Sequence, residues 1–403
     1  MPRVIEAAAP GASCSADIVE DDSDHEEWVA NDNGGFELSK RASYAEPPPP
    51  MKTPRRRFKP SPAILIVIIA IVLAIISRTN LFWCGARGIP LGTLFRFSGY
   101  SLNAIPDLSG QTALVTGANT GLGLEVARQL ARKSANLVLA CRDLSKCDDA
   151  AASIHQFGRP RPRTIQLDLG DLKSVAKAAT QLQKQIDRLD MLILNAGVAA
   201  QFPISKTRDG IERTFQMNYL GHFALTTKLK PLLQRTAKAR KRRVRIVHLT
   251  SGAHRGAPIE GVPLHLDRIN GEMGPYARYG MAKLASLVFS NELSRRWGSF
   301  AISNAVHPGV VATQMLRSEN FAAMIGPIGG RLAWLVAKAR NLLFAYSART
   351  AAVSVLYAAV GAGETTGQLI VPVATLWPPH HAKATDEAFA RRLWEFSEAL
   401  SRA

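Results

Sequence analysis

Residues 111–133 read QTALVTGANTGLGLEVARQLARK, a short apolar strand followed at once by a glycine-rich turn and an amphipathic helix. Gly117 permits the tight turn, Gly121 lets the backbone approach a pyrophosphate, and Gly123 lets the helix pack close to the strand. The first N–H groups of such a helix lack backbone partners and carry the positive end of the helix dipole, so they attract phosphate. The stretch therefore predicts a dinucleotide-binding turn, whose remaining contacts we assign to Asn119, Thr120 and Leu122.

The same alternation of strand and helix continues along the chain. Further strands are predicted at residues 136–141, 164–167, 191–194, 245–249 and 301–305, and helices at residues 122–133, 172–188, 219–234 and 279–297. Strict alternation implies a parallel sheet, because each crossover helix has to cover one face of the sheet. We therefore expect an α/β doubly wound parallel sheet, the Rossmann fold, in a single catalytic domain over residues 107–403.

The ends of the following strands complete a cofactor site, since ligands of such sheets bind at the carboxyl ends of the strands. Arg142 follows the second predicted strand and can pair with the 2′-phosphate of NADP. The alternative is that Asp143 binds the ribose hydroxyls of NAD, and we favour NADP(H). Asp168, together with Leu169, is placed to reach the adenine. The floor of the site is assigned to Asn195, Ala196 and Gly197.

Tyr279 and Lys283 are four residues apart in a predicted helix and therefore share one face. A free phenol is a poor base at neutral pH, but a neighbouring ammonium and a positively charged nicotinamide favour the phenolate. Tyr279 could thus act as general acid in reduction and general base in oxidation. Ser251, just past the fifth predicted strand, could hold the substrate oxygen, and Asn218 could hold a water that relays the proton through Lys283.

These motifs, in this order, resemble the short-chain dehydrogenase/reductase family. Longer matches resemble its branch of retinol dehydrogenases and the WW-domain oxidoreductase, namely TGANTGLG, LACRD, TRDGIERTFQMNYLGHFALT, LTSGAH, YGMAKLASLVFSNEL and HPGVVAT. The resemblance implies a catalytic tetrad of Asn218, Ser251, Tyr279 and Lys283. It also implies that the nicotinamide carboxamide is held by Pro308, Gly309 and Thr313. Ala282 and Thr250 stand where the family often has serine, and the absence of a WW domain puts a scaffold role in doubt.

The largely apolar stretch at residues 321–344 bears on the substrate. The resemblance implies that this segment covers the substrate, which would then be lipophilic, such as a retinoid, a steroid or a lipid aldehyde. A core helix or a homodimer interface explains the segment equally well. Two other functions are left open, a protochlorophyllide reductase-like enzyme and a non-catalytic NADPH-sensing regulatory protein.

The composition changes twice ahead of the catalytic domain. Residues 1–59 form an acidic, proline-rich tail with a basic end and few large apolar side chains, which predicts disorder. Residues 60–78 contain an unbroken apolar run at 63–76 and would span roughly 27 Å as a helix, so we expect a transmembrane helix and then a linker over residues 79–106. Basic residues before the run favour a cytoplasmic N-terminus, although both flanks are basic and the side of the catalytic domain stays open. We expect a single-pass membrane protein of the endoplasmic reticulum or another endomembrane.

The formal net charge of +18 is concentrated in the body of the chain. Its densest cluster, at residues 238–245, could be a localisation signal or a lipid-binding patch, but a solvated loop that leads into a strand is favoured. No aromatic side chains interleave with these basic ones and no zinc-finger spacing occurs, so neither nucleic-acid binding nor a metal site is expected. The four cysteines suggest no disulfide framework, and Cys141 is predicted to be a small buried residue.

Overall fold

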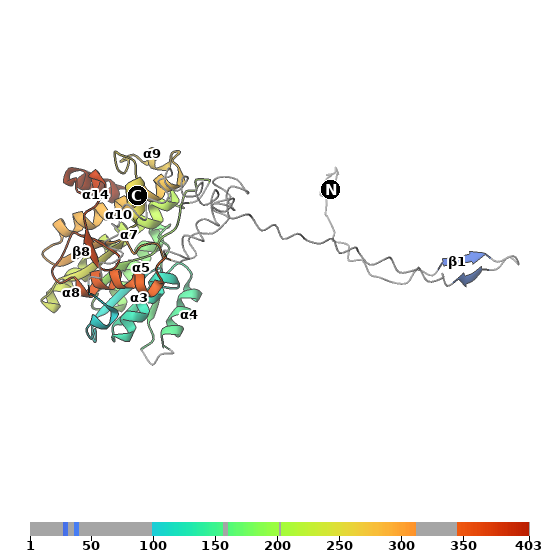
Figure 1. Ribbon diagram of the computed structural model, residues 1–403, viewed down its shortest axis with the longest axis horizontal. Helices are drawn as coiled ribbons and strands as arrows, with labels where there is room; N and C mark the ends of the chain where they lie inside the picture. Colours follow the sequence, from blue (N-terminus) through green and yellow to red (C-terminus); the bar gives the residue numbers. More distant parts are fainter. Residues whose placement is uncertain are drawn as a thin grey trace, which may run out of the picture. The chain divides into compact units, whose positions relative to one another are not determined.

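The computed structural model describes residues 27–30, 36–39, 99–155, 160–200, 203–311 and 345–402. The chain forms two compact units, Met1–Leu65 and Ile66–Ala403. In the first unit, β1 (Glu27–Ala30) and β2 (Phe36–Ser39) form an antiparallel pair within the segment whose composition predicts disorder (Figure 1). The apolar run at residues 63–76 and most of the predicted linker lie outside the described residues. Within the described ranges, no helix is both long and apolar enough to span a bilayer.

The second unit is built on an eight-stranded sheet with the strand order β10-β9-β8-β7-β6-β3-β4-β5. The strands are β3 (Thr112–Thr116), β4 (Asn136–Cys141), β5 (Arg163–Gln166), β6 (Met191–Leu194), β7 (Val244–Leu249), β8 (Ala301–Val306), β9 (Leu369–Val371) and β10 (Thr375–Trp377). All neighbouring strands are parallel except β10, which is antiparallel to β9. The predicted parallel sheet is confirmed. The chain order of the strands reverses between β3 and β6, which is where ligands bind in such sheets.

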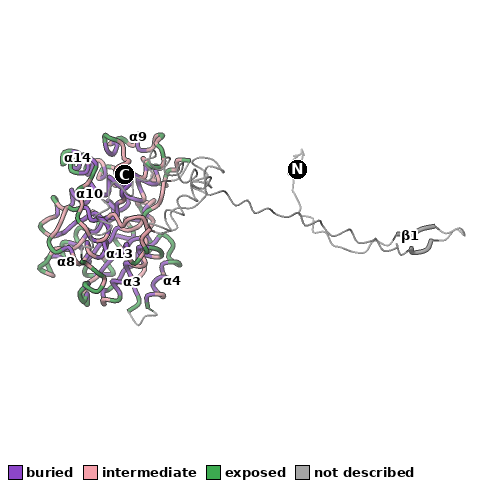
Figure 2. Tube along the Cα trace, viewed as in Figure 1, coloured by how far each residue is buried: buried purple, intermediate pink, exposed green. Residues whose placement is uncertain are grey.

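Helices cover both faces of the sheet (Figure 1). One face carries α5 (Leu172–Gln185), α7 (Gly221–Lys228), α8 (Lys230–Arg240), α10 (Pro275–Arg296) and α14 (Glu387–Arg402), and the other carries α3 (Gly121–Arg132), α4 (Leu144–His155) and α13 (Ala348–Leu356). Side chains alternate along a strand, so Leu114 of β3 packs into the first hydrophobic cluster and Val115 into the second. The buried residues lie between the sheet and these helices (Figure 2).

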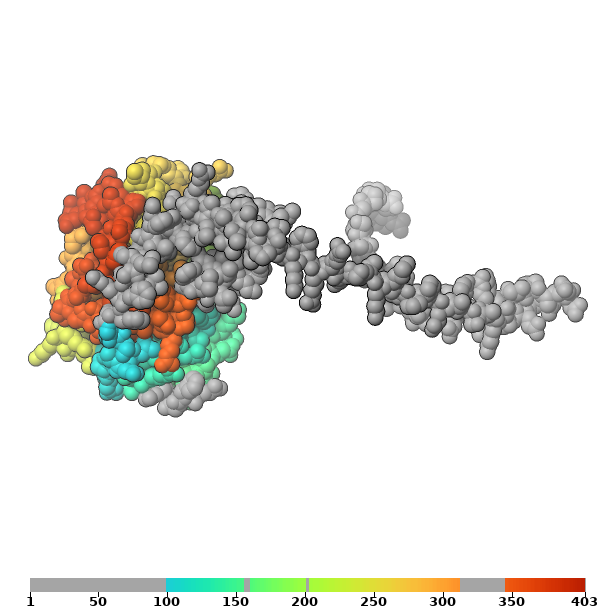
Figure 3. Space-filling model, in the orientation of Figure 1, coloured from blue at the N-terminus to red at the C-terminus, as the bar shows by residue number. Residues whose placement is uncertain are grey.

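Shorter helices connect these elements. They are the 3₁₀ helices η2 (Leu102–Ala104), η4 (Gly252–Gly256) and η6 (Ala382–Ala384), the π-helices η3 (Gln216–Leu220) and η5 (Tyr357–Gly361), and the short α-helices α6 (Arg213–Phe215) and α9 (Leu266–Asn270). Tyr100, near the start of the described part of this unit, packs on Tyr357 with ring centroids 5.2 Å apart. The space-filling view shows this cyan start beside the orange-red α13 region (Figure 3).

The prediction of one helix at residues 219–234 was wrong in its bounds. Helical structure already begins at Arg213, because the side chain of Glu212 accepts a hydrogen bond from Phe215 N–H and caps it. It is interrupted after Lys228, where α8 starts afresh with a proline in its first turn.

The basic cluster at residues 238–245 lies at the amino edge of the sheet, where α8 ends and β7 begins. Arg240 and Arg242 pair with Asp190, which precedes β6, at 3.1 and 3.5 Å. Arg243 pairs with Glu364 and donates to the carbonyl oxygen of Gly298 at 3.1 Å. The cluster thus spans the end of α8, the connecting loop and the start of β7, so only its middle lies in the loop that the sequence favoured. Its ion pairs connect the starts of several strands.

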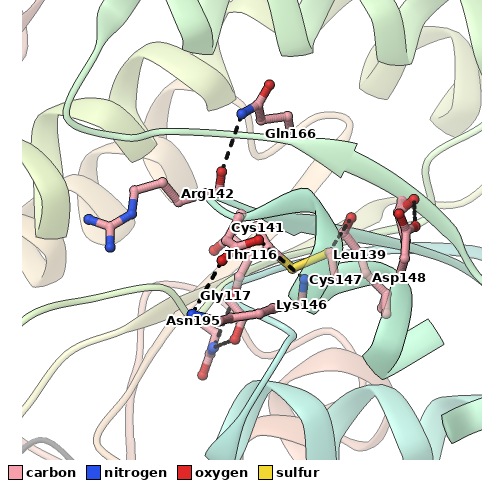
Figure 4. The surroundings of a disulfide bond; sticks show 12 residues. Thr116, Gly117, Leu139, Cys141, Arg142, Lys146, Cys147, Asp148, Gln166 and Asn195 are labelled. Atoms are coloured by element: carbon pink, nitrogen blue, oxygen red, sulfur yellow. Dashed lines mark hydrogen bonds and ion pairs between the residues drawn. A yellow bond between two sulfur atoms is a disulfide. The ribbon is translucent and has the colours of Figure 1, made fainter. Parts of the chain in front are cut away.

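A disulfide joins Cys141, at the end of β4, to Cys147 on α4, with an S–S distance of 2.10 Å (Figure 4). The expectation of no disulfide was therefore wrong. The turn from strand to helix brings the two Cα atoms to 5.8 Å, within the range that a disulfide bridges. Cys141 is buried, as predicted.

Candidate active site

The glycine-rich turn after β3 is braced by the segment that follows β6. Asn195 Nδ2 donates to the carbonyl oxygens of Thr116 and Gly117 at 2.9 and 3.3 Å. The N–H of Ala196 donates to Thr116 Oγ1 at 3.0 Å. The structure therefore brings the predicted turn and the predicted floor of the cofactor site together. The same turn contains the other predicted contacts, Asn119, Gly121 and Leu122.

Two glycines of this turn leave no room for a side chain. A Cβ atom on Gly117 would lie 2.9 Å from the Cα of Ala196. A Cβ atom on Gly123 would overlap both Asn195 Nδ2 and the carbonyl oxygen of Gly117. Thr120, the N-cap residue of α3, makes no side-chain hydrogen bond to the first helical turn. The turn thus presents the bare backbone that a pyrophosphate needs.

Arg142 and Asp143 are the two candidates for binding the adenosine ribose of the cofactor or its 2′-phosphate. Arg142 directly follows β4, and its exposed side chain points away from the disulfide (Figure 4). Asp143 is paired with Lys146 at 3.2 Å, and hydrogen bonds from the backbone and side chain of Lys146 hold the pKa of Asp143 below its usual range. Within the described residues the Arg142 guanidinium forms no ion pair. Of the two side chains, the arginine is therefore the one with an uncommitted charge.

Asp168 and Leu169 follow β5. One carboxylate oxygen of Asp168 accepts a hydrogen bond from Gly170 N–H at 2.9 Å, and its own N–H donates to Ser174 Oγ at 3.0 Å. Leu169 is buried, and its carbonyl oxygen lies so close to Gly221 that a Cβ atom on this glycine would contact it at 2.5 Å. Both predicted residues thus lie at the carboxyl edge of the sheet.

Three of the predicted catalytic side chains meet between β7 and α10. Ser251 forms a side-chain hydrogen bond with the phenol of Tyr279. Lys283 lies one turn further along α10, and its Nζ is 5.7 Å from the centroid of the Tyr279 ring. This Nζ donates to the carbonyl oxygen of Leu249, the last residue of β7, at 2.9 Å. The structure therefore brings the serine, tyrosine and lysine together at one place beside the end of β7.

Burial shifts the pKa values of both ionisable groups on α10. It raises the pKa of Tyr279 to about 12, and the hydrogen bond with Ser251 offsets part of that rise. It lowers the pKa of Lys283 to about 8, because an ammonium loses its hydration in the interior. This rise is the effect of burial alone, and the expected stabilisation of the phenolate beside a positively charged nicotinamide stays a prediction. The phenol is therefore protonated at neutral pH, as a proton donor must be.

Asn218 lies in the π-helix η3, next to the lysine. A Cβ atom on Gly197 would lie 2.8 Å from Asn218 Oδ1 and 3.5 Å from Lys283 Nζ. The amide of Asn218 accepts from Val198 N–H at 2.7 Å and donates to Val198 O at 2.9 Å. The side chain is therefore committed to the backbone of Val198.

The residues predicted to hold the nicotinamide carboxamide follow β8. Pro308 and Gly309 lie directly after His307, whose N–H donates to the carbonyl oxygen of Ile370 in β9 at 2.8 Å. Gly309 has φ +83°, and a Cβ atom there would meet the ring of Tyr346 at 2.5 Å. Thr313 and the apolar segment at residues 321–344 lie outside the described residues.

The sequence reasoning missed two buried groups beside the site. Thr116 is the polar end of an otherwise apolar strand, and His222 follows Asn218 by four residues; their side chains bond to each other at 3.0 Å. It also missed a buried ion pair, Arg278 with Glu212 at 3.4 Å, next to Tyr279 on α10. The four-residue spacing of Asn218 and His222 was the one available signal, since it places both on one helix face.

The comparisons with known proteins agree with this geometry. The family model described as short chain dehydrogenase matches residues 111–263. Retinol dehydrogenase 13 of Mus musculus is 37% identical over 300 residues, covering 73% of this chain and 84% of that protein. The WW domain-containing oxidoreductase of Drosophila melanogaster is 34% identical over 303 residues, covering 73% and 69%. A crystal structure of an uncharacterized protein from Mycobacterium paratuberculosis superposes with a TM-score of 0.56 at 30% identity, covering 76% of this chain and 98% of that one.

Proposed function

The chain belongs to the short-chain dehydrogenase/reductase family, in its retinol dehydrogenase-like branch, and on that premise we propose that it transfers hydride between NADP(H) and a lipophilic carbonyl or alcohol. The family supports the general activity, an oxidoreductase that interconverts a carbonyl and an alcohol. The observation that carries the proposal is the meeting of Ser251, Tyr279 and Lys283 next to the residues 195–197 that brace the glycine-rich turn.

The residues of this chain fit a phosphorylated dinucleotide. Gly117 and Gly123 leave bare backbone for a pyrophosphate. Arg142, which forms no ion pair with any other described residue, could bind a 2′-phosphate. By the family resemblance, Pro308, Gly309 and Thr313 would hold the nicotinamide carboxamide. When bound, the nicotinamide supplies the hydride in reduction and accepts it in oxidation.

The side chains on and beside α10 would handle the proton. In reduction, the phenol of Tyr279 donates its proton to the substrate oxygen while the hydroxyl of Ser251 hydrogen-bonds that oxygen. Lys283 then returns a proton toward the phenolate from a water held at Asn218. In oxidation the phenolate of Tyr279 removes the proton from the alcohol.

A retinoid, a steroid or a lipid aldehyde, reached from a membrane, is the proposed substrate. The support is the apolar composition of residues 60–78 and 321–344, together with the substrate named for the mouse relative. We accordingly propose a single-pass anchor at residues 60–78 and a catalytic domain over residues 107–403, in the endoplasmic reticulum or another endomembrane.

The test measures the rate of NADPH oxidation by the protein in detergent micelles, with retinaldehyde, a steroid ketone or a long-chain fatty aldehyde as the substrate. Parallel assays with NADH measure the preference between the two cofactors. Tyr279→Phe keeps the ring and removes the proton donor, so we expect a rate loss of at least about a hundredfold with unchanged NADPH affinity. Tyr276→Phe, one turn earlier on α10, is the matched control and should retain activity. Equal rates for Tyr279→Phe and the unmodified chain would overturn the assignment. Binding of NADPH without turnover of any substrate would instead favour an NADPH-sensing protein.

A further inference from the structure

A buried histidine on α7 connects the two halves of the candidate site. His222 is 4% exposed and lies four residues after Asn218. Its Nε2 is 3.0 Å from Oγ1 of Thr116, the last residue of β3. Its Nδ1 is 3.3 Å from the carbonyl oxygen of Asn218. One imidazole ring therefore joins the strand that leads into the glycine-rich turn to the residue assigned to the proton relay.

The partners of this ring determine its tautomer. A carbonyl oxygen can only accept, so Nδ1 of His222 carries the hydrogen bonded to Asn218. Burial lowers the pKa of His222 to about 3, so the ring is neutral at pH 7 and its Nε2 accepts from the Thr116 hydroxyl. The other acceptor near that hydroxyl, the carbonyl of Ile193, is farther away at 3.5 Å. Thr116 Oγ1 also accepts from Ala196 N–H. Each group thus donates to the next, from Ala196 N–H to Thr116, from Thr116 to His222, and from His222 to the carbonyl of Asn218.

The helix geometry at this point opens the Asn218 carbonyl to side chains. Asn218 is the central residue of the π-helix η3, in which the N–H of Gly221 bonds to the carbonyl of Gln216, five residues back. The wider spacing moves the backbone partners away from the regular α-helical positions. His222 Nδ1 and Ser286 Oγ both bond to the Asn218 carbonyl, each at 3.3 Å. Side chains, rather than the helix alone, therefore hold this carbonyl in place.

We propose that His222 is a positioning residue of this enzyme, which holds the main-chain carbonyl of Asn218 in a fixed place relative to the cofactor turn. This inference rests on the function proposed above. The ring bonds to neither Tyr279 nor Lys283, so it acts through Asn218 on one side and through Thr116 on the other. Holding this carbonyl would fix the backbone that places Asn218 beside Lys283 in the proposed relay.

Substitutions at His222 separate its two bonds. His222→Leu removes both, and we expect kcat for carbonyl reduction to fall by about thirtyfold while KM for the carbonyl changes by less than about twofold. His222→Asn retains an N–H donor near the position of Nδ1, so it should recover most of that loss. Thr116→Val removes the partner of Nε2 and should weaken NADPH binding by about threefold, with a smaller effect on kcat. Failure of His222→Asn to recover kcat would overturn the positioning role.

His248 provides a matched control for the effect of removing a buried imidazole. It is 2% exposed, burial lowers its pKa to about 3, and its Nε2 bonds to Ser303 Oγ at 3.1 Å. His248→Leu should destabilise the fold to a similar extent as His222→Leu and leave kcat of the folded enzyme unchanged. Equal losses of kcat in the two leucine variants would show that the effect is structural and would overturn the inference.

A second readout is independent of turnover. In ¹⁵N-histidine-labelled protein at pH 7, the His222 resonance should be that of a neutral ring protonated at Nδ1, and an Nε2–H tautomer would overturn the inference. His222→Leu should also weaken NADPH binding by about threefold, through loss of the Thr116 contact. If the unmodified chain reduces no carbonyl, the proposed function fails, whereas the tautomer and the NADPH affinity still decide whether His222 fixes the turn and the Asn218 carbonyl.

Discussion

The two edges of the central sheet hold their polar side chains in opposite ways. At the amino edge, Arg240 and Arg242 remain partly exposed and pair with Asp190. At the carboxyl edge, Lys283 and His222 are buried, and burial lowers their pKa values to about 8 and about 3. Burying an ionisable group costs free energy unless its charge is paired. Asp190 is also buried, but two arginines pair with its charge, whereas Lys283 and His222 form no ion pair among the described residues, as in a candidate site. The partly hydrated ion pairs at the other edge tie strands together.

The sharpest test of the carboxyl edge is Gly123→Val. Its Cβ would overlap the side chain of Asn195 and the carbonyl of Gly117, so the turn cannot keep its shape. We expect NADPH affinity to fall at least about a thousandfold, or about 4 kcal/mol, in a fluorescence titration. Gly274→Ala, where a Cβ would meet nothing within 4 Å, should bind normally. Normal binding by the Gly123 variant would remove the cofactor from this edge.

The buried ammonium predicts a pH dependence of stability. The pKa of Lys283 is lowered from 10.5 to about 8, so below pH 8 it is charged in both the folded and the unfolded chain and its burial destabilises the fold fully. Between pH 8 and 10.5 that penalty is lost. Relative to Lys283→Met, the unmodified chain should gain up to about 3 kcal/mol of unfolding free energy over this interval. Urea unfolding near pH 7 and near pH 10 measures the difference, and a constant difference would contradict the buried charge.

At the amino edge the largest effect is expected for Asp190→Asn. Asp190 accepts from the N–H of Thr112 at 2.9 Å and from Arg240 Nε at 3.1 Å, and its side chain is only 4% exposed. Loss of its charge should lower the unfolding free energy by about 2 kcal/mol, with NADPH affinity and kcat unchanged. A change in kcat without a change in stability would show that this edge is not purely structural.

The smallest effect is expected for Glu364→Gln. Glu364 pairs with Arg243 and Arg245, but its side chain is 75% exposed. Solvent screening limits such pairs, so thermal and urea unfolding should show a loss below about 1 kcal/mol that shrinks further in high salt. A loss larger than that of Asp190→Asn would reverse the ranking within this edge.

Patterns that depend on neighbouring residues were enough to predict the sheet and most of the site. Alternating apolar strands and amphipathic helices predicted the parallel order, because strands buried on both faces leave continuous apolar runs. The glycine-rich turn, Ser251 and the Tyr279–Lys283 pair are short motifs whose spacing carries their chemistry, and the structure brings them together. β9 and β10 were missed because each is only three residues long.

Features that depend on distances through space were not predictable in the same way. The bond between His222 and Thr116 joins residues 106 positions apart, and its direction follows from a tautomer that only the partners define. The π-helix around Asn218 has no periodicity of its own in the sequence. The rise in the pKa of Tyr279 could not be predicted from the motif, because burial is a property of the packed fold.

In the cytosol glutathione keeps thiols reduced, whereas a disulfide persists in an oxidising organelle. The bond between Cys141 and Cys147 closes the loop that contains Arg142. The redox state of the compartment therefore affects the loop of the residue that is proposed to select the cofactor. A chain made in the cytosol would carry two sulfhydryl groups there. Alkylation of intact cells, followed by mass spectrometry of this peptide, would therefore report whether the catalytic domain resides in a reducing or an oxidising compartment.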